Sequence, residues 1–176
     1  MTPDKMTPDK MTPDKMTPDK MTSDNRQKIA AYAELFGRLR PEDLPALQEM
    51  LADQVVFQDP FSRLVGPEAF ISVFAHMFEV MDAPAFAVLD IAYSDEAGYL
   101  KWRMTGRVRR LPALPIAITG MSEVRLDAKG QVIAHLDHWD SASQLLVHLP
   151  FLGRLVGWLL GRFKAPASRQ GVATSR

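Results

Sequence analysis

The sequence predicts an α+β fold in which helices precede a meandering, strongly bent, mainly antiparallel sheet. Apolar residues recur at helical spacing up to about Met81, and one β-branched stretch, VVFQ at 55–58, interrupts them. From Phe86 to Asp140, runs of β-branched and aromatic residues alternate with turn residues. The predicted order is therefore helix, helix, strand, helix and a four-strand meander, with an extra helix near the C-terminus.

Composition limits the class of protein. The 176 residues are 47% hydrophobic and 24% charged, which suits one compact domain with a substantial core. With 21 basic and 21 acidic residues the formal net charge is zero, so no overall charge draws the chain to nucleic acid or to an anionic membrane. The absence of cysteine excludes disulfides and thiolate nucleophiles or metal ligands, and it is compatible with a reducing cytoplasm.

The N-terminus repeats MTPDK four times and adds a degenerate unit, MTSDN. These units have almost nothing to bury, so residues 1–23 are expected to form a disordered tail. The tail lacks the apolar stretch of about 7–15 residues that a signal peptide needs, which favours a cytoplasmic location. Each unit begins with a methionine that could start translation: Met1, Met6, Met11, Met16 or Met21.

Three helices are expected before the meander. The first runs from Asp24 to about Arg38, capped by Ser23 or Asp24, and the second lies within PEDLPALQEMLADQ at 41–54. The third begins at Gly66-Pro67-Glu68. Its apolar stripe consists of Phe70, Phe74, Met77, Phe78 and Met81. Such aromatic stripes form a core more often than a ligand site.

The meander consists of FAVLDIAYS, YLKWRMTGRVR, IAITGMSEVRL and VIAHLDHWD, with turns at SDEAG and DAKG. In the second strand, alternation places an apolar set on one face and a basic set on the other. The apolar set is Leu100, Trp102, Met104 and Val108, and the basic set is Lys101, Arg103, Arg107 and Arg109. An anion site is one interpretation of the basic row, but a solvated face balanced by neighbours such as Glu123 is preferred.

Two stretches, VVFQDPFSRLVGPEAF and GQVIAHLDHWD, together with this element order, resemble the nuclear transport factor 2-like superfamily in its ketosteroid isomerase and SnoaL-like branch. The resemblance covers about Asp24 to Ser143. It implies a cone-shaped sheet around an apolar cavity that the helices close, a small apolar ligand, no cofactor and a homodimer through the outer sheet face. The residues expected to line the cavity are Phe57, Phe74, Phe78, Trp102, Met104, Ser122 and Trp139.

The resemblance also implies catalytic residues. Asp59, in the DP after the first strand, matches the general base of the isomerases, and a carboxylate at the rim of an apolar cavity becomes a better base as it loses hydration. The alternative is that Asp59 only ends the strand by turn chemistry. Tyr32 matches the tyrosine that donates a hydrogen bond to the ketone oxygen. The acidic residue expected on TGMSEVRL is absent, and Ser122 stands in its place.

The last strand departs from the isomerases, which are mainly apolar there. The family pattern points Ile133, His135, Asp137 and Trp139 into the cavity. Asp137 can orient His135 or share a proton with Asp59, and a water between the acids would suit hydrolysis or hydration. No metal site is expected, although His135, Asp137 and Asp59 could supply three ligands, because His138 points the other way. A satisfied polar pair in a wet pocket is the alternative.

The C-terminal segment is expected to end the 24–164 domain with a helix over about Pro150 to Phe163, followed by a disordered tail at 165–176. The helix is apolar around most of its circumference and too short to span a bilayer, which takes about 20 residues. We expect a lid over the open end of the cone or an arm on a dimer mate. Contact of its basic residues with a membrane surface is the less favoured alternative.

The sequence thus predicts binding of a small, largely apolar molecule in a cone cavity, with isomerase-like or hydratase/hydrolase-like acid–base chemistry on a carbonyl or epoxide by Asp59, Tyr32, His135 and Asp137. The alternative is a non-catalytic ligand carrier or a dimeric interaction module, because one fold serves many functions. Nucleic acid is not expected as a partner.

The tail generates a first prediction. Because the MTPDK repeats bury almost nothing, removal of residues 1–20 should leave the melting temperature and the oligomeric state unchanged. Thermal unfolding and light scattering of the two chains would check this. A lower melting temperature or a changed mass would show that the repeats pack on the domain.

Overall fold

A computed structural model of the chain describes residues 21–110, 115–149 and 152–163. The predicted tails at 1–20 and 164–176 lie outside the described residues. The elements in chain order are α1 (Ser23–Gly37), η1 (Pro41–Asp43), α2 (Leu44–Glu49), β1 (Leu51–Gln58), β2 (Arg63–Val65), α3 (Pro67–Val80), β3 (Met81–Tyr93), β4 (Gly98–Val108), β5 (Pro115–Leu126), β6 (Val132–His138), α4 (Ser141–Gln144), η2 (Leu146–His148) and α5 (Leu152–Gly161).

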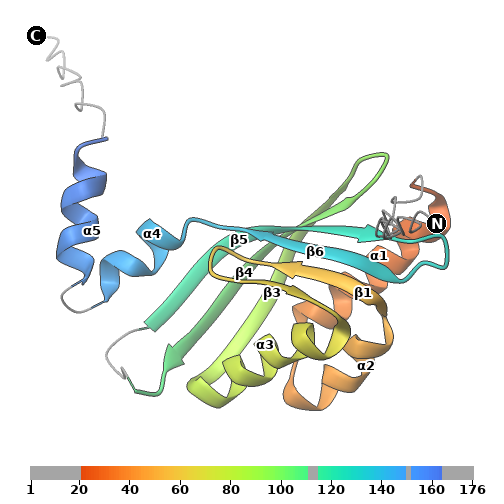
Figure 1. Cartoon of the computed structure of the whole chain (residues 1–176), viewed down its shortest axis with the longest axis horizontal. Coiled ribbons are helices and arrows are strands. Elements are labelled where there is room, and N and C mark those ends of the chain that lie inside the picture. The colour runs from red at the N-terminus through yellow and green to blue at the C-terminus, as the bar shows by residue number, and fades with distance from the viewer. Residues whose placement is uncertain (1–20, 111–114, 150–151, 164–176) are drawn as a thin grey trace, which may run out of the picture.

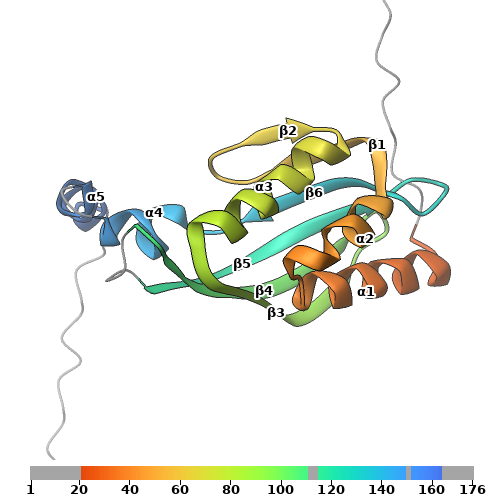
Figure 2. The same cartoon turned by 90° about the horizontal axis from the view of Figure 1, so that it is seen from below.

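The six strands form one curved, unclosed sheet in the order β2-β1-β6-β5-β4-β3. The pair β1–β6 is parallel, and every other neighbouring pair is antiparallel. Figures 1 and 2 show α1, α2 and α3 together on one face of this sheet. The α+β class and the mainly antiparallel meander are therefore as the sequence predicts. The predicted homodimer through the opposite face stays a prediction.

The helical half differs from the prediction in its boundaries. Thr22, rather than Ser23 or Asp24, caps α1, since its side chain accepts a hydrogen bond from the backbone N–H of Asn25. The second helix, expected within residues 41–54, stops at Glu49, before Met50 and Leu51. Leu51 already belongs to β1, where it is buried and pairs with Val132 of β6, so strand pairing overrides the helical spacing.

The sheet contains two features that the sequence prediction lacked. The strand β2 is only three residues long, and it forms a hairpin with β1 just after the Asp-Pro turn. The strand β3 begins at Met81, which was expected to end the stripe of the third helix, rather than at Phe86. The pairing register of β3 with β4 shifts between Asp82 and Ala85, and Ala83 has a positive φ of 46°. A bulge therefore accommodates Pro84 near the start of β3.

The chain after β6 also differs from the predicted single helix. Two short helical turns, α4 and η2, come before α5, and Pro150 lies outside the described residues. The side-chain amide of Gln144 accepts from the backbone N–H of Thr119 (2.7 Å) and donates to its carbonyl (3.0 Å), which fastens α4 to β5. Beyond it, α5 packs on η2 and stands away from the sheet and from α1, α2 and α3 (Figure 1). Its expected role as a lid over the open end of the cone or as an arm on a dimer mate stays a prediction.

The core lies between the three helices and the inner face of the sheet. There α1 approaches β4 closely at Gly98, where an added Cβ would lie 2.6 Å from Cγ2 of Ile29. Ile29 is fully buried, and Tyr32 follows it one helical turn later on the same side of α1. The contact between Gly98 and Ile29 therefore sets the height of α1, and of Tyr32, above the sheet. No helix in the described part of the chain is long and apolar enough to cross a membrane.

This close approach generates a second prediction. Gly98→Ala should lower the free energy of unfolding by about 1–3 kcal/mol, because the β-branched Ile29 side chain is stiff and α1 must shift. Urea unfolding of purified protein measures the change. Gly157→Ala is the matched control, since nothing lies within 4 Å of its added Cβ, and it should cost no stability. A Gly98→Ala protein as stable as wild type would contradict the tight packing of α1 on β4.

Candidate functional site

A chain of hydrogen-bonded side chains crosses the inner face of the sheet from α1 to β4. The hydroxyl of Tyr32 on α1 lies 2.7 Å from Nδ1 of His135 on β6, and Nε2 of His135 lies 3.0 Å from Oδ1 of Asp137. Ser122 on β5, directly opposite Asp137, donates to the same oxygen at 2.5 Å. Trp102 on β4 completes the chain, because its indole N–H donates to the Ser122 hydroxyl at 2.7 Å.

The direction of each hydrogen bond follows from the chemistry of the two ends. The indole of Trp102 only donates, so Ser122 accepts from it and turns its own hydrogen to Asp137. At the other end, burial raises the pKa of Tyr32 well above its ordinary value, with the negative charge of Asp137 as a second cause. Tyr32 is therefore neutral. In the tautomer in which its hydroxyl donates to Nδ1, His135 donates from Nε2, and all donation converges on Oδ1 of Asp137.

The surroundings of the chain are aromatic and largely shielded from solvent. His135 and Ser122 are fully buried. The imidazole of His135 lies 5.2–5.8 Å from four rings, those of Tyr32, Phe36, Phe57 and Phe70. Asp137 is the point where the chain approaches solvent, with 11% of its side chain exposed. Two residues later, Trp139 packs against Phe61, which is 57% exposed, so the surface near Asp137 is apolar as well.

A glycine makes room for the indole end of the chain. At Gly120 an added Cβ would lie 2.5 Å from the Trp102 ring and 2.9 Å from Cβ of Trp139. Gly120 and Trp102 are opposite each other in the β4–β5 pair, so the indole lies directly over the glycine on its way to Ser122. A larger residue at position 120 would displace Trp102 from Ser122.

The structure places Asp59 differently from the other candidate residues. Its Oδ1 accepts from the backbone N–H groups of Phe61 (2.8 Å) and Ser62 (2.6 Å), and its own N–H donates to the carbonyl of Ser62. These bonds close the β1–β2 hairpin. This is the turn chemistry that was the alternative to a general-base role for Asp59. Among the described residues, no hydrogen bond joins Asp59 to the chain between Tyr32 and Trp102.

The structure brings Tyr32, His135 and Asp137 together, and Tyr32 meets His135 rather than open space. Its single hydroxyl hydrogen is used there, so in this arrangement Tyr32 positions the imidazole. The expected lining residues all contribute to the core between sheet and helices. Phe57, Phe74, Trp102 and Ser122 are buried, and Phe78, Met104 and Trp139 are partly buried against them. Their role in lining a ligand cavity stays a prediction.

Three features of the site were missed. The link of Trp102 through Ser122 to Asp137 and the space at Gly120 depend on the pairing register, whereas the closeness of Phe36 and Phe70 to His135 depends on how α1 and α3 pack on the sheet. Strand alternation assigns Trp102, Gly120, Ser122 and Asp137 to the inner face, but only the observed register sets them side by side. Within residues 21–110, 115–149 and 152–163, no group of three or more His, Asp or Glu side chains is placed to hold a metal ion.

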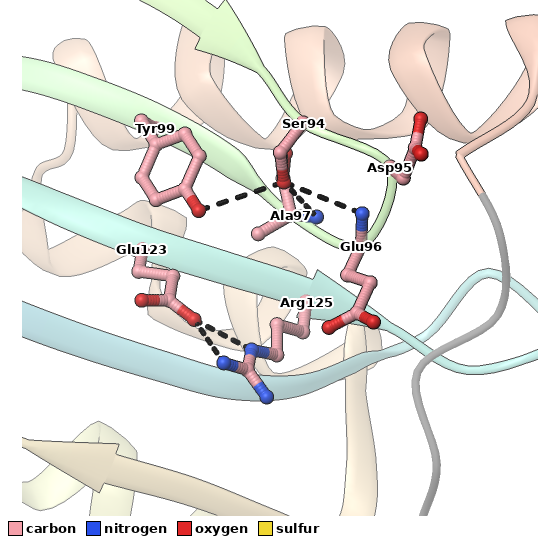
Figure 3. Close-up of a pocket in the computed structure, with 7 residues that line it drawn as sticks. All are labelled: Ser94, Asp95, Glu96, Ala97, Tyr99, Glu123 and Arg125. Atoms are coloured by element: carbon pink, nitrogen blue, oxygen red, sulfur yellow. Dashed lines mark hydrogen bonds and ion pairs between the residues drawn. The ribbon is translucent and has the colours of Figure 1, made fainter.

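A separate pocket of about 320 Å³ lies at the β3–β4 turn (Figure 3). Its charged residues largely satisfy one another or face solvent, since Arg125 is paired with Glu123 and Ser94 caps the turn. Tyr99, Glu123 and Arg125 alternate with buried neighbours, which places the pocket on the outer face of the sheet. None of the predicted site residues lines it, so the candidate site is the hydrogen-bonded chain on the inner face.

Comparisons with solved structures show the fold. A steroid delta-isomerase from Pseudomonas aeruginosa is 19% identical, with 81% of this chain and 96% of that chain covered and a TM-score of 0.53. An NTF2-like protein of unknown function from Burkholderia pseudomallei is 18% identical, with 69% of this chain and 95% of that chain covered and a TM-score of 0.58. SalBIII, an epoxide hydrolase/cyclase-like enzyme of pyran ring formation in the polyether salinomycin, is 13% identical. The comparison covers 66% of this chain and 91% of that chain, with a TM-score of 0.56.

No curated protein matches the chain. The family of the SnoaL-like domain, however, matches residues 29–135, which include Tyr32, Trp102, Ser122 and His135 and stop two residues before Asp137. The match spans more than half of the 176 residues and runs from α1 into β6. By this match the chain belongs to the SnoaL-like domain family, and its fold is that of NTF2-like proteins.

Proposed function

We propose that this protein is an enzyme in which Asp137 moves a proton on a small, largely apolar molecule that carries a carbonyl or epoxide group. One observation carries the proposal: two donors, His135 and Ser122, converge on a single oxygen of a carboxylate that lies at the solvent end of an aromatic interior. Burial of polar side chains costs free energy of folding unless they are hydrogen-bonded. We therefore take this fully connected chain in an aromatic interior to serve a function.

The two hydrogen bonds give Asp137 a fixed orientation. Both are made by Oδ1, and no hydrogen bond within the described residues is made by Oδ2. The side chain is 11% exposed, so Oδ2 is the oxygen from which a ligand proton can be reached. A base that is held in place and surrounded by apolar groups is well suited to take a proton from a weak acid.

On a ketone, Oδ2 of Asp137 would take a proton from the carbon next to the carbonyl, and the C–H electron pair would move into the enolate. Where the ketone carries a neighbouring C=C bond, the enolate extends into a dienolate, and return of the proton to its far carbon shifts the double bond and completes an isomerisation. A protonated Asp137 has less need of two donors, so once the ligand has opened access to the fully buried Ser122, its hydroxyl is free to turn toward the enolate oxygen. This provides a donor at the position where the acidic residue of the isomerases is absent.

On an epoxide, the same oxygen would take a proton from an attacking water. The water oxygen bonds to a ring carbon, the C–O bond of the ring breaks, and the ring oxygen takes up a proton from solvent. Two similar folds carry chemistry of these two kinds by their descriptions, a steroid delta-isomerase and an epoxide hydrolase/cyclase-like enzyme. Because both proteins have low sequence identity to this chain, their likeness supports only the shared scaffold. The choice between a ketone and an epoxide is left to experiment.

The next prediction separates the two candidate bases. Asp137→Asn keeps an oxygen for His135 and Ser122 but removes the proton acceptor, so turnover should fall about 10²–10⁴-fold while the fold is retained. Asp59→Asn keeps the oxygen that the turn amides of Phe61 and Ser62 need, and it should retain turnover. Deuterium exchange next to the carbonyl across a panel of apolar ketones, and ring opening across a panel of apolar epoxides, provide the readouts.

Two other results of this experiment are informative. Loss of turnover in Asp59→Asn with retention in Asp137→Asn would move the base to the hairpin turn and contradict the proposal. A ligand that binds wild type and both variants equally, with no exchange and no ring opening in any of them, would show a non-catalytic carrier.

The burial of Tyr32 generates a prediction about alkaline stability. Its pKa is raised in the folded state, so the folded protein keeps a proton that the unfolded chain loses from about pH 10. The stabilisation is complete below about pH 10 and falls as pH rises further, by up to about 1.4 kcal/mol per pH unit. Above about pH 10, Tyr32→Phe should therefore lose stability less steeply than wild type in urea unfolding at stepped pH.

Tyr99→Phe is the matched control, because the Tyr99 hydroxyl lies in an exposed contact with Ser94. It should follow the wild-type slope. Equal slopes for Tyr32→Phe and wild type would show that Tyr32 ionises as freely in the folded protein as in the unfolded chain, which its burial against His135 does not allow.

A further inference from the structure

The helix α5 exposes an apolar side that no part of the described chain covers. None of its residues is buried. Leu155, Trp158 and Leu159 are 61%, 59% and 50% exposed, and Leu152 before them and Phe163 after them are 41% and 81% exposed. The spacing of three and four residues places them along one side of the helix. A contiguous apolar surface of this kind marks an interaction site.

The helix is held outward by its connections. The bonds of Gln144 to Thr119 fasten α4 to β5, and α5 then packs on η2. At Gly153 an added Cβ would lie 2.1 Å from the carbonyl oxygen of Val147, so only glycine permits this contact. Gly153 at the start of α5 therefore meets η2, and Leu155 and Leu159 remain outside, as the isolated position of α5 in Figure 1 illustrates.

The side-chain charges of the C-terminal segment, residues 141–176, are all of one sign. None of the 21 acidic residues of the chain follows Asp140, whereas five of the 21 basic residues do. Two of these five, Arg154 and Arg162, lie in the part of the chain that is described and are exposed. The guanidinium of Arg162 sits over the ring of Trp158, 4.5 Å from its centroid, which places a cation beside the apolar stripe.

We propose that α5 docks lengthwise on an anionic lipid surface. Leucines with a tryptophan and a phenylalanine on one side, and cations without any carboxylate beside them, are the side chains of an interfacial helix. Ten residues span about 15 Å, half of a hydrocarbon core of about 30 Å, so α5 lies along the surface. Residues 1–140 carry all the acids and 16 of the bases, so their net negative charge turns the rest of the molecule away from the lipid.

A second copy of the chain fits α5 less well. Two such helices packed side by side would bring Arg154 and Arg162 near their own copies, and the segment has no carboxylate to balance them. Anionic lipid headgroups supply the missing negative charge along the whole helix. The proposal stands apart from the chemistry of Asp137, because it uses no residue of the hydrogen-bonded chain.

The test is co-sedimentation of the full chain with lipid vesicles. The protein should bind mixed phosphatidylglycerol–phosphatidylcholine vesicles, bind pure phosphatidylcholine vesicles at least tenfold more weakly, and be released by salt. Arg154→Gln and Arg162→Gln should each lower the partition coefficient about fivefold, the equivalent of about 1 kcal/mol per cation. Tryptophan fluorescence should shift to the blue with the anionic vesicles, and Trp158→Phe should remove that shift.

A pair of double variants separates docking from general stickiness. Leu155→Ser with Leu159→Ser should abolish vesicle binding, whereas Val65→Ser with Val80→Ser, at positions that are 50% and 37% exposed on β2 and α3, should leave it unchanged. Equal loss in both double variants, or binding that persists without Leu155 and Leu159, would overturn the proposal. So would a wild-type protein that ignores vesicles but forms a dimer that the Leu155 and Leu159 changes dissociate, since the occupant would then be a second copy.

Discussion

The burial of His135 next to Asp137 is the constraint on which the rest of the structure depends. An imidazole enclosed by Tyr32, Phe36, Phe57 and Phe70 is fully shielded from solvent, so both of its nitrogens need protein partners. Nδ1 finds one on α1, and Nε2 finds the other on the same strand, two residues away. The height of α1 and the direction of β6 are therefore coupled through one ring.

The same requirement extends across the sheet. Asp137 needs donors, and these come from Ser122 opposite and, one step further, from Trp102. A slip of one residue between β5 and β6 would turn Ser122 to the outer face and leave Asp137 with the imidazole alone. Glycines at 98 and 120 permit the close approaches that bring Ile29 to β4 and the Trp102 indole over β5. Side-chain packing and the hydrogen bonds of the buried polar groups thus favour the same pairing register of β4, β5 and β6.

Much of the fold follows from the residues read in order. Alternation in β4, the turns at Asp127-Ala128-Lys129-Gly130 and the Gly66-Pro67 helix start have local causes, and these elements appear where the sequence predicts them. The errors arise where pairing with a distant strand decides. Leu51 has helical spacing, yet it pairs with Val132, and Met81 has the spacing of α3, yet it pairs with Val108. Tertiary contacts outweigh local preference at both positions.

The candidate site shows the same division between local and distant causes. A sequence can reveal that His135 and Asp137 alternate on one strand, but not that the proton of Tyr32 is used by His135 or that Asp59 is used by its own turn. Those facts depend on the curl of the sheet over α1 and on the hairpin that β2 closes. The C-terminal helix is the converse case. Its charge and apolar pattern are visible in the residues, and only its position away from the sheet reveals that the apolar side remains exposed.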